Sequence, residues 1–146
     1  MKRSSQPVLT MLAALALALG AGTVNAAAEW FTIVGDPRDP AVDTVQVDPT
    51  SIMGVGDLKL FKLRVNRQAT RQNPRGVKFR SFESIAEVDC DRKAARYVRT
   101  QFYEAPLWQS SSTAVDYGTT TDSPMVFRAM EPNPADRIIR AVCTYR

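Results

Sequence analysis

The stretch from Val77 to Cys90, VKFRSFESIAEVDC, alternates polar and apolar side chains as a half-buried β-strand does. Successive side chains of an extended chain point to opposite faces, so the two faces of this strand differ in chemistry. The apolar face comprises Phe82, Ser84, Ala86, Val88 and Cys90, and the other face carries Glu83, Glu87 and Asp89. The sequence therefore predicts a strand with a cysteine on its buried side.

Clusters of Pro and Gly divide the chain around this stretch into further short segments of strand-like composition. We expect strands at 29–35, 44–47, 58–67 and 125–130, with turns at 48–51 and 54–57. The adjacent apolar residues Leu60 and Phe61 predict a bulge or burial on both faces. The segment 68–76 is predicted to be the loop before the Val77 strand.

The segments after Cys90 give weaker patterns. Residues 93–103 fit both a strand and a helical stripe, and their aromatic and β-branched content favours the strand. Residues 109–122 are rich in Ser and Thr, which predicts a loop with at most a short strand at 114–117.

A helix is predicted close to the end of the sequence. Asn133 is a capping residue, Pro134 suits the first helical position, and Asp136 suits the first turn. One stripe of the predicted helix comprises Ala135, Ile138, Ile139, Val142 and Cys143. The chain is therefore expected to have an α+β fold, a mostly β structure with one C-terminal helix packed on it.

The two cysteines, Cys90 and Cys143, both lie on predicted apolar faces. Cysteines in a chain that leaves the reducing cytosol usually pair, so a disulfide between them would hold the helix against the sheet. A redox-active pair is the alternative, but the Cys-x-x-Cys spacing of such pairs is absent.

Export is predicted from residues 1–26. Lys2 and Arg3 precede the apolar run 8–19, and small residues lead to Ala26, which is the layout of a secretory signal peptide. The run is shorter than the ~20 residues of a membrane span. Cleavage after Ala26 and cleavage after Ala28 both fit. Removing 26 of the 146 residues leaves 120, a common size for one domain, and no Cys before Cys90 offers a lipid anchor.

Charge is unevenly distributed along the chain. Residues 27–57 hold six acids and one base, whereas residues 58–82 hold eight bases and no acid. On two adjacent strands these bases would form a face for a polyanion, and the candidate residues are Lys62, Arg64, Arg71, Arg75, Lys78 and Arg80. Neutralisation by Glu29, Asp43 or Asp48 from neighbouring strands is the alternative.

Catalytic signatures are sparse. The chain contains no His, which excludes Ser-His-Asp and Cys-His arrangements and most zinc sites. Glu87 and Asp89 are the remaining candidate acid pair, and a solvated acidic face paired with nearby arginines explains them better. Trp30 is expected in the core and Trp108 in an exposed contact. No catalytic residue, metal site or cofactor is predicted.

Several motifs carry a resemblance to a known family. These motifs are Trp30, then Asp48-Pro49-Thr50-Ser51-Ile52, Lys78 to Phe82, Glu87 to Arg92 and a late Cys143. On these motifs, the chain resembles the surface-adhesin protein E-like family over residues 29–146. The CNP1-like exported proteins are a second similar group. The resemblance implies an antiparallel sheet with a C-terminal helix held by the disulfide. It also implies an envelope protein of a Gram-negative bacterium.

The sequence thus favours a non-enzymatic binding protein, periplasmic or secreted and without a lipid anchor. Expected partners are an acidic glycan, lipopolysaccharide or a host matrix protein, whereas nucleic acid is not expected in that compartment. A structural or accessory periplasmic domain without a ligand of its own is the alternative. The oligomeric state is left open.

Overall fold

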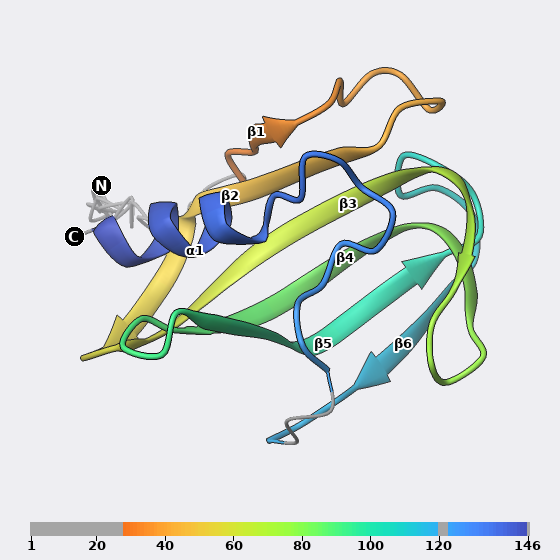
Figure 1. Ribbon diagram of the computed structural model, residues 1–146. Helices are drawn as coiled ribbons and strands as arrows, with labels where there is room; N and C mark the ends of the chain where they lie inside the picture. Colours follow the sequence, from red (N-terminus) through yellow and green to blue (C-terminus); the bar gives the residue numbers. More distant parts are fainter. Residues whose placement is uncertain (1–27, 120–122, 146) are drawn as a thin grey trace, which may run out of the picture.

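A computed structural model describes residues 28–119 and 123–145 of the chain. Its described part contains one antiparallel sheet, in which six strands follow one another in sequence order, and one helix (Figure 1). The elements are β1 (Phe31–Val34), β2 (Thr44–Val55), β3 (Leu58–Gln72), β4 (Lys78–Asp89), β5 (Ala94–Tyr103), β6 (Ser112–Asp116) and α1 (Ala135–Thr144). The predicted fold class is confirmed. The predicted signal peptide lies outside the described residues.

The β4 strand confirms the prediction from the Val77 stretch. Phe82, Ala86 and Val88 are buried, and Glu83 and Glu87 point away from them. On β3, Phe61, Leu63 and Val65 are buried with the apolar set of β4. We call the side with these residues the inner face of the sheet, and the side with Lys62, Arg64 and Glu83 the outer face.

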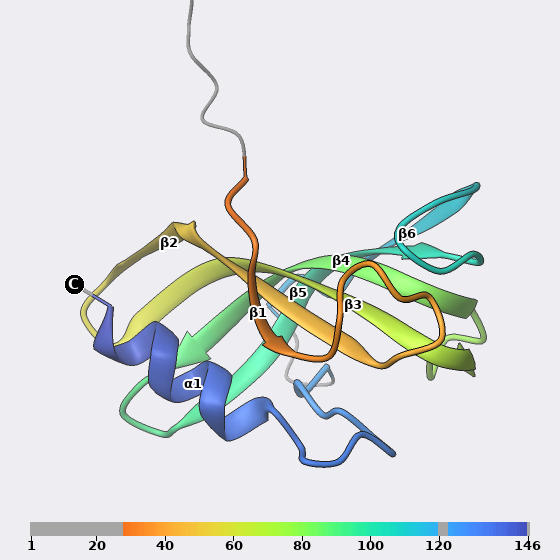
Figure 2. The same ribbon diagram turned by 90° about the horizontal axis from the view of Figure 1, so that it is seen from above.

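Residues 123–134, which precede α1, cross the inner face, and α1 lies on the same side of the sheet (Figures 1 and 2). Met125, Phe127 and Met130 from this segment are buried in the core. The Met125 backbone N–H donates to the Ala95 carbonyl of β5 at 2.8 Å. The core is therefore enclosed between the sheet on one side and this segment with α1 on the other.

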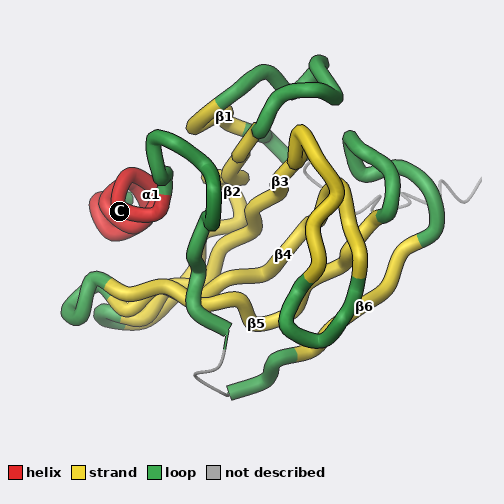
Figure 3. Tube along the Cα trace, turned by 45° about the vertical axis from the view of Figure 1, so that its right-hand side comes forward, coloured by secondary structure: helices red, strands yellow, loops and turns green. Residues whose placement is uncertain are grey.

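Helix α1 packs through the stripe predicted for it. Ile138 and Val142 are buried, and Ala135, Ile139 and Cys143 pack against the core from partly buried positions. The N-cap residue is Pro134 rather than the predicted Asn133, because α1 begins at Ala135, and Asn133 Oδ1 accepts a hydrogen bond from the Ala135 N–H at 3.0 Å. In Figure 3 the helix is seen close to end-on against the curved sheet.

Two links from the sheet hold the C-terminal half of α1. The predicted disulfide is present, with Cys90 and Cys143 joined at an S–S distance of 2.05 Å. Lys59 of β3 adds a second link, because its Nζ donates to the carbonyls of Val142 at 3.2 Å and Tyr145 at 2.6 Å. The last turn of α1 has no basic residue of its own, so the β3 lysine supplies the cation that a helix C-terminus favours.

The predicted turn at Asp48–Ser51 is wrong, because β2 continues through it. Asp48 pairs with Lys62 and Met53 with Leu60, so four residues of β2 lie opposite Phe61 alone. Ser51 Oγ accepts a hydrogen bond from the Lys62 N–H at 2.8 Å in place of a ladder carbonyl. The turn-forming residues thus build a bulge within β2, opposite the phase slip at Leu60 and Phe61.

Two other strand predictions need correction. The segment 125–130 alternates buried and exposed residues, but no strand forms there, and only Pro124 bridges Arg96. The burial of its side chains alternates because the segment lies across the inner face of the sheet. The strand expected at 58–67 continues to Gln72, which shortens the predicted loop at 68–76. The strand assignment for 93–103 is confirmed by β5, and β6 lies close to the short strand expected at 114–117.

Candidate binding surface

Strand pairing brings polar residues into rows on the outer face. One row joins Gln46, Arg64, Glu83 and Gln101 across β2 to β5. The next row joins Lys62 to Ile85 and Arg99, both of which are exposed. The outer face therefore presents cations and an acid side by side, rather than charge of one sign.

Arg64 lies between two tryptophans at the centre of this face. Its guanidinium carbon is 4.4 Å from the Trp30 ring centroid and 4.0 Å from the Trp108 ring centroid. Its Nε donates to Gln46 Oε1 at 2.7 Å, and Gln46 Nε2 donates to Thr32 Oγ1 at 2.9 Å. We call Trp30, Arg64 and Trp108 the tryptophan–arginine stack.

Arg64 keeps its charge within the stack although its surroundings lower its pKa. Burial lowers the pKa of Arg64, and the nearby Glu83 carboxylate acts in the opposite direction. An arginine side chain titrates far above neutral pH, so Arg64 remains a cation. A cation against the faces of two aromatic rings is attracted by their quadrupoles. Glu83 is itself held on this face, where it accepts a hydrogen bond from the Tyr103 hydroxyl at 3.1 Å.

A strained loop after β5 positions Trp108. Leu107, Trp108 and Ser110 have φ values of 56°, 59° and 78°, which side-chain-bearing residues seldom adopt. Three hydrogen bonds hold this conformation: Leu107 N–H to Asn66 Oδ1, Trp108 N–H to Ser81 Oγ and Trp108 Nε1 to the Phe82 carbonyl. Asn66 and Ser81 are fully buried, so the loop is anchored from within the sheet. Strain of this kind concentrates at functional sites.

The six predicted polyanion-binding residues do not share one face. Lys62 and Lys78 are exposed, and Arg64 belongs to the stack. Arg80 donates to the carbonyls of Arg67 and Pro40, each at 2.9 Å.

The remaining two residues of that set come from the hairpin between β3 and β4. Arg75 lies at its tip, where its guanidinium is 4.8 Å from the Tyr117 ring centroid and donates to the Asp116 carbonyl. Arg71 lines a cavity on the inner face. The expectation of a common face was wrong for Arg71 because β3 continues to Gln72 with a register shift between Asn66 and Arg71, and Arg71 then lies beside the cavity with Arg67.

The acids predicted to neutralise the basic residues have other roles. Asp43 Oδ1 lies 3.2 Å from Arg67 Nε, so it pairs with a buried arginine beside the predicted set. Asp48 Oδ1 accepts hydrogen bonds from the backbone and the hydroxyl of Thr50. Two acids lie opposite residues of the set in the strand register, Asp48 opposite Lys62 and Glu83 opposite Arg64.

Glu87 and Asp89 are engaged in ion pairs. Glu87 Oε1 lies 2.9 Å from Arg96 Nε, and Asp89 Oδ2 lies 3.6 Å from Arg92 Nε. Asp89 also accepts a hydrogen bond from the Arg92 N–H at 2.9 Å. Both carboxylates are thus paired as a solvated acidic face would be. No group of three or more metal-ligating side chains occurs in the described part of the chain.

A family model described as Surface-adhesin protein E matches residues 30–144. The chain belongs to the surface-adhesin protein E family. No curated protein and no solved structure gives a significant match. The family assignment confirms the resemblance found in the sequence and points to a non-enzymatic, adhesin-like protein.

The adhesin domain as matched includes both tryptophans of the stack and both cysteines. The described helix α1 is too short and too polar to cross a membrane. The sequence predictions for the two tryptophans are wrong, because Trp30 lies outside the core and Trp108 is half-buried rather than exposed. Both rings lie against Arg64 on the outer face, which the sequence did not predict. The strand register and the strained loop together bring both rings to Arg64, so no local sequence pattern predicts the stack.

Proposed function

We propose that this adhesin-family chain is an exported, non-enzymatic binding protein of the bacterial envelope or exterior, and that its outer face binds an acidic or polyanionic partner. Family membership supports an adhesin-like protein with an exterior partner. The tryptophan–arginine stack carries the assignment to the outer face. Trp, Tyr and Arg are the residues that dominate binding energy at protein interfaces, and Tyr103 lies on the same face.

An acidic glycan fits the chemistry of this face. Sugar rings pack on aromatic side chains, and sulfate or carboxylate groups accept hydrogen bonds from arginine and lysine. Arg64 is held in place by Gln46 and the two rings, so little side-chain entropy is lost when a partner binds. Lys62 and Arg99 are exposed in the neighbouring row and extend the cationic surface.

Retention on a heparin column tests this proposal. Wild-type mature chain is compared with Lys62→Gln/Arg64→Gln on the outer face. Arg71→Gln/Arg75→Gln is the matched control, since it removes the same charge from the hairpin between β3 and β4. We expect the outer-face pair to elute at clearly lower salt than wild type, and the control to elute much closer to wild type. Equal shifts for the two pairs, or no retention of wild type, would refute a specific outer face.

An accessory envelope domain is the second candidate function, and exposed apolar residues favour it. Phe31 on β1 is 63% exposed, and Met53 and Leu58 at the β2–β3 hairpin are 65% and 50% exposed. Large apolar side chains on an edge strand and a hairpin are suited to packing against another protein. Pull-down from envelope extract, compared with pull-down from host matrix material, separates the two functions. A Phe31→Ser variant that loses only the envelope partner would favour the accessory role.

Export completes the proposal, with residues 1–26 removed and residues 27–146 forming one domain. Mass spectrometry of the protein from its native host measures the new N-terminus. A chain that starts after Ala26 or Ala28 supports export. Recovery of the full-length chain in the cytosol contradicts it.

A further inference from the structure

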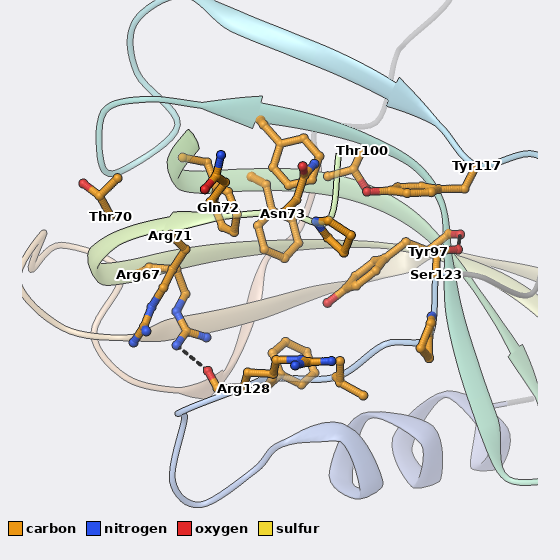
Figure 4. Close-up of a pocket in the computed structure, with 17 residues that line it drawn as sticks. Arg67, Thr70, Arg71, Gln72, Asn73, Tyr97, Thr100, Tyr117, Ser123 and Arg128 are labelled. Atoms are coloured by element: carbon orange, nitrogen blue, oxygen red, sulfur yellow. Dashed lines mark hydrogen bonds between the residues drawn. The ribbon is translucent and has the colours of Figure 1, made fainter. Parts of the chain in front are cut away.

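A cavity of about 620 Å³ lies on the inner face, between the sheet and the segment that precedes α1 (Figure 4). Strands β3, β4 and β5 form one wall, and residues 123–128 form the other. The volume falls within the range of ~300–1,000 Å³ that is typical of small-molecule sites. The cavity is on the opposite side of the sheet from the tryptophan–arginine stack.

Aromatic side chains make up much of the wall. Phe79, Phe82 and Phe102 form one packed cluster, in which the Phe79 and Phe102 ring centroids are 4.9 Å apart. Tyr97 continues the cluster from β5, with its ring 5.6 Å from that of Phe82. Phe127 faces them from the opposite wall. Such a lining favours an apolar ligand body, because ring faces and edges both offer dispersion contacts.

One end of the cavity is cationic. Arg67, Arg71 and Arg128 line it, and none of the described lining residues is acidic. Figure 4 shows the Arg67 and Arg71 side chains directed together toward the segment that carries Arg128. Arg67 has partners already, since it pairs with Asp43 and its Nη2 donates to the Arg128 carbonyl at 2.9 Å.

Unlike Arg67, Arg71 has no counter-charge among the described residues. Its Nε is buried and has no hydrogen-bond partner, and no described acid forms an ion pair with it. The Arg71 charge also acts unfavourably on its neighbour, because burial and Arg71 both lower the pKa of Arg67. The Arg71 side chain lines the cavity, so an anionic group bound there would supply the counter-charge that a partly buried cation otherwise lacks.

We infer that the cavity binds an amphipathic carboxylate, with its apolar body against the Phe79, Phe82 and Phe102 cluster and its carboxylate at Arg71. A guanidinium and a carboxylate match in shape and charge, which favours this anion at the cationic end. The Tyr97 hydroxyl points into the cavity toward the same end and offers one further donor (Figure 4). This site is independent of the polyanion-binding function proposed for the outer face.

The ligand body has two chemical sources, an acyl chain and a fused aromatic ring, so the binding experiment has two arms. Dodecanoate and 2-naphthoate are titrated into the mature chain by calorimetry, with dodecanol and 2-naphthol as uncharged counterparts. We expect at least one carboxylate to bind about tenfold or more tightly than its uncharged counterpart, since a charge-assisted hydrogen bond contributes about 1.5–3 kcal/mol. The carboxylate that binds shows whether the apolar body of the ligand is an acyl chain or a fused aromatic ring.

Three variants locate the site. Arg71→Gln should remove the preference for the carboxylate, whereas Arg75→Gln, an equal change at the hairpin tip outside the cavity, should retain it. Val126→Trp fills the cavity from a wall residue that is 49% exposed, so it should abolish binding without disturbing the core. Circular dichroism confirms folding of each variant. No binding by wild type, a carboxylate preference that survives in Arg71→Gln, or binding that survives in Val126→Trp would overturn the inference.

Discussion

Removing the disulfide should have a large effect on stability and a small effect on the native structure. The perturbation is the double variant Cys90→Ser/Cys143→Ser, which leaves no free thiol to exchange or oxidise. The bond joins residues 53 positions apart, and in the chain-entropy model a loop of that length contributes about 4 kcal/mol. The free energy of unfolding of small domains is of order 5–15 kcal/mol, so this loss is a substantial share of it.

The other contacts of α1 remain in the double variant. Ile138 and Val142 still bury their side chains, and Lys59 still donates to the carbonyls at the end of the helix. The far-ultraviolet spectrum should therefore stay close to that of wild type, because the bond acts mainly on the unfolded chain.

Urea denaturation of oxidised wild type and of the double variant measures the effect. We expect the free energy of unfolding to fall by about 3–4 kcal/mol and the melting temperature to fall by roughly 10–20 °C. Reduced wild type is the control and should match the variant. A loss below about 1 kcal/mol with an unchanged native spectrum would refute the reasoning, since it would mean that the bond does not restrict the unfolded chain.

Three further predictions follow from single contacts. Lys59→Met should lower the free energy of unfolding by about 1–2 kcal/mol and speed amide exchange at the end of α1, whereas Lys62→Met, which removes the same charge, should leave exchange unchanged. Burial raises the pKa of Tyr97 above the value of about 10 that a tyrosine has in the unfolded chain. Above that pH the folded chain binds more protons than the unfolded chain, so the free energy of unfolding falls as pH rises. Between pH 8 and 11, the urea midpoint of Tyr97→Phe should therefore fall less steeply than that of wild type. Trp108→Ala should cost about 2 kcal/mol in urea denaturation, because the stack on Arg64 and the hydrogen bond to the Phe82 carbonyl are both lost, and a change below about 0.5 kcal/mol would argue against the stack.

The parts of the fold that sequence predicted well are those with local periodicity. The alternation at Val77 to Cys90 and the stripe from Ala135 to Cys143 each contain their own evidence, because the burial pattern repeats every two or every 3.6 residues. Both cysteines fell on these periodic elements, so their facing geometry could be predicted as well. The length of β3 was missed because 68–72 is a run of mostly polar, mostly exposed residues without alternation.

The candidate binding surface and the cavity depend on contacts between distant residues. The stack joins three separate parts of the chain, which carry Trp30, Arg64 and Trp108. Placing Trp108 on Arg64 requires positive φ angles, which the residue types at 107–110 do not predict. The inward direction of Arg71 follows only once β3 is known to continue past Asn66. A stretch of bases predicts charge density, but strand register decides on which face each base lies.

The bond between Cys90 and Cys143 can form only after a delay, because Cys143 is synthesised later than Cys90. Strands that pair with their neighbours in sequence can form hairpins as the polypeptide emerges, so β1 to β4 are able to pair before residue 143 exists. At synthesis rates of 5–20 residues per second, Cys90 waits roughly 3 to 10 seconds for its partner. A chain interrupted anywhere in that interval keeps a lone thiol at the end of β4. In an oxidising compartment, a thiol-specific reagent would therefore label such a truncated chain but not the complete chain, in which both sulfur atoms are bonded.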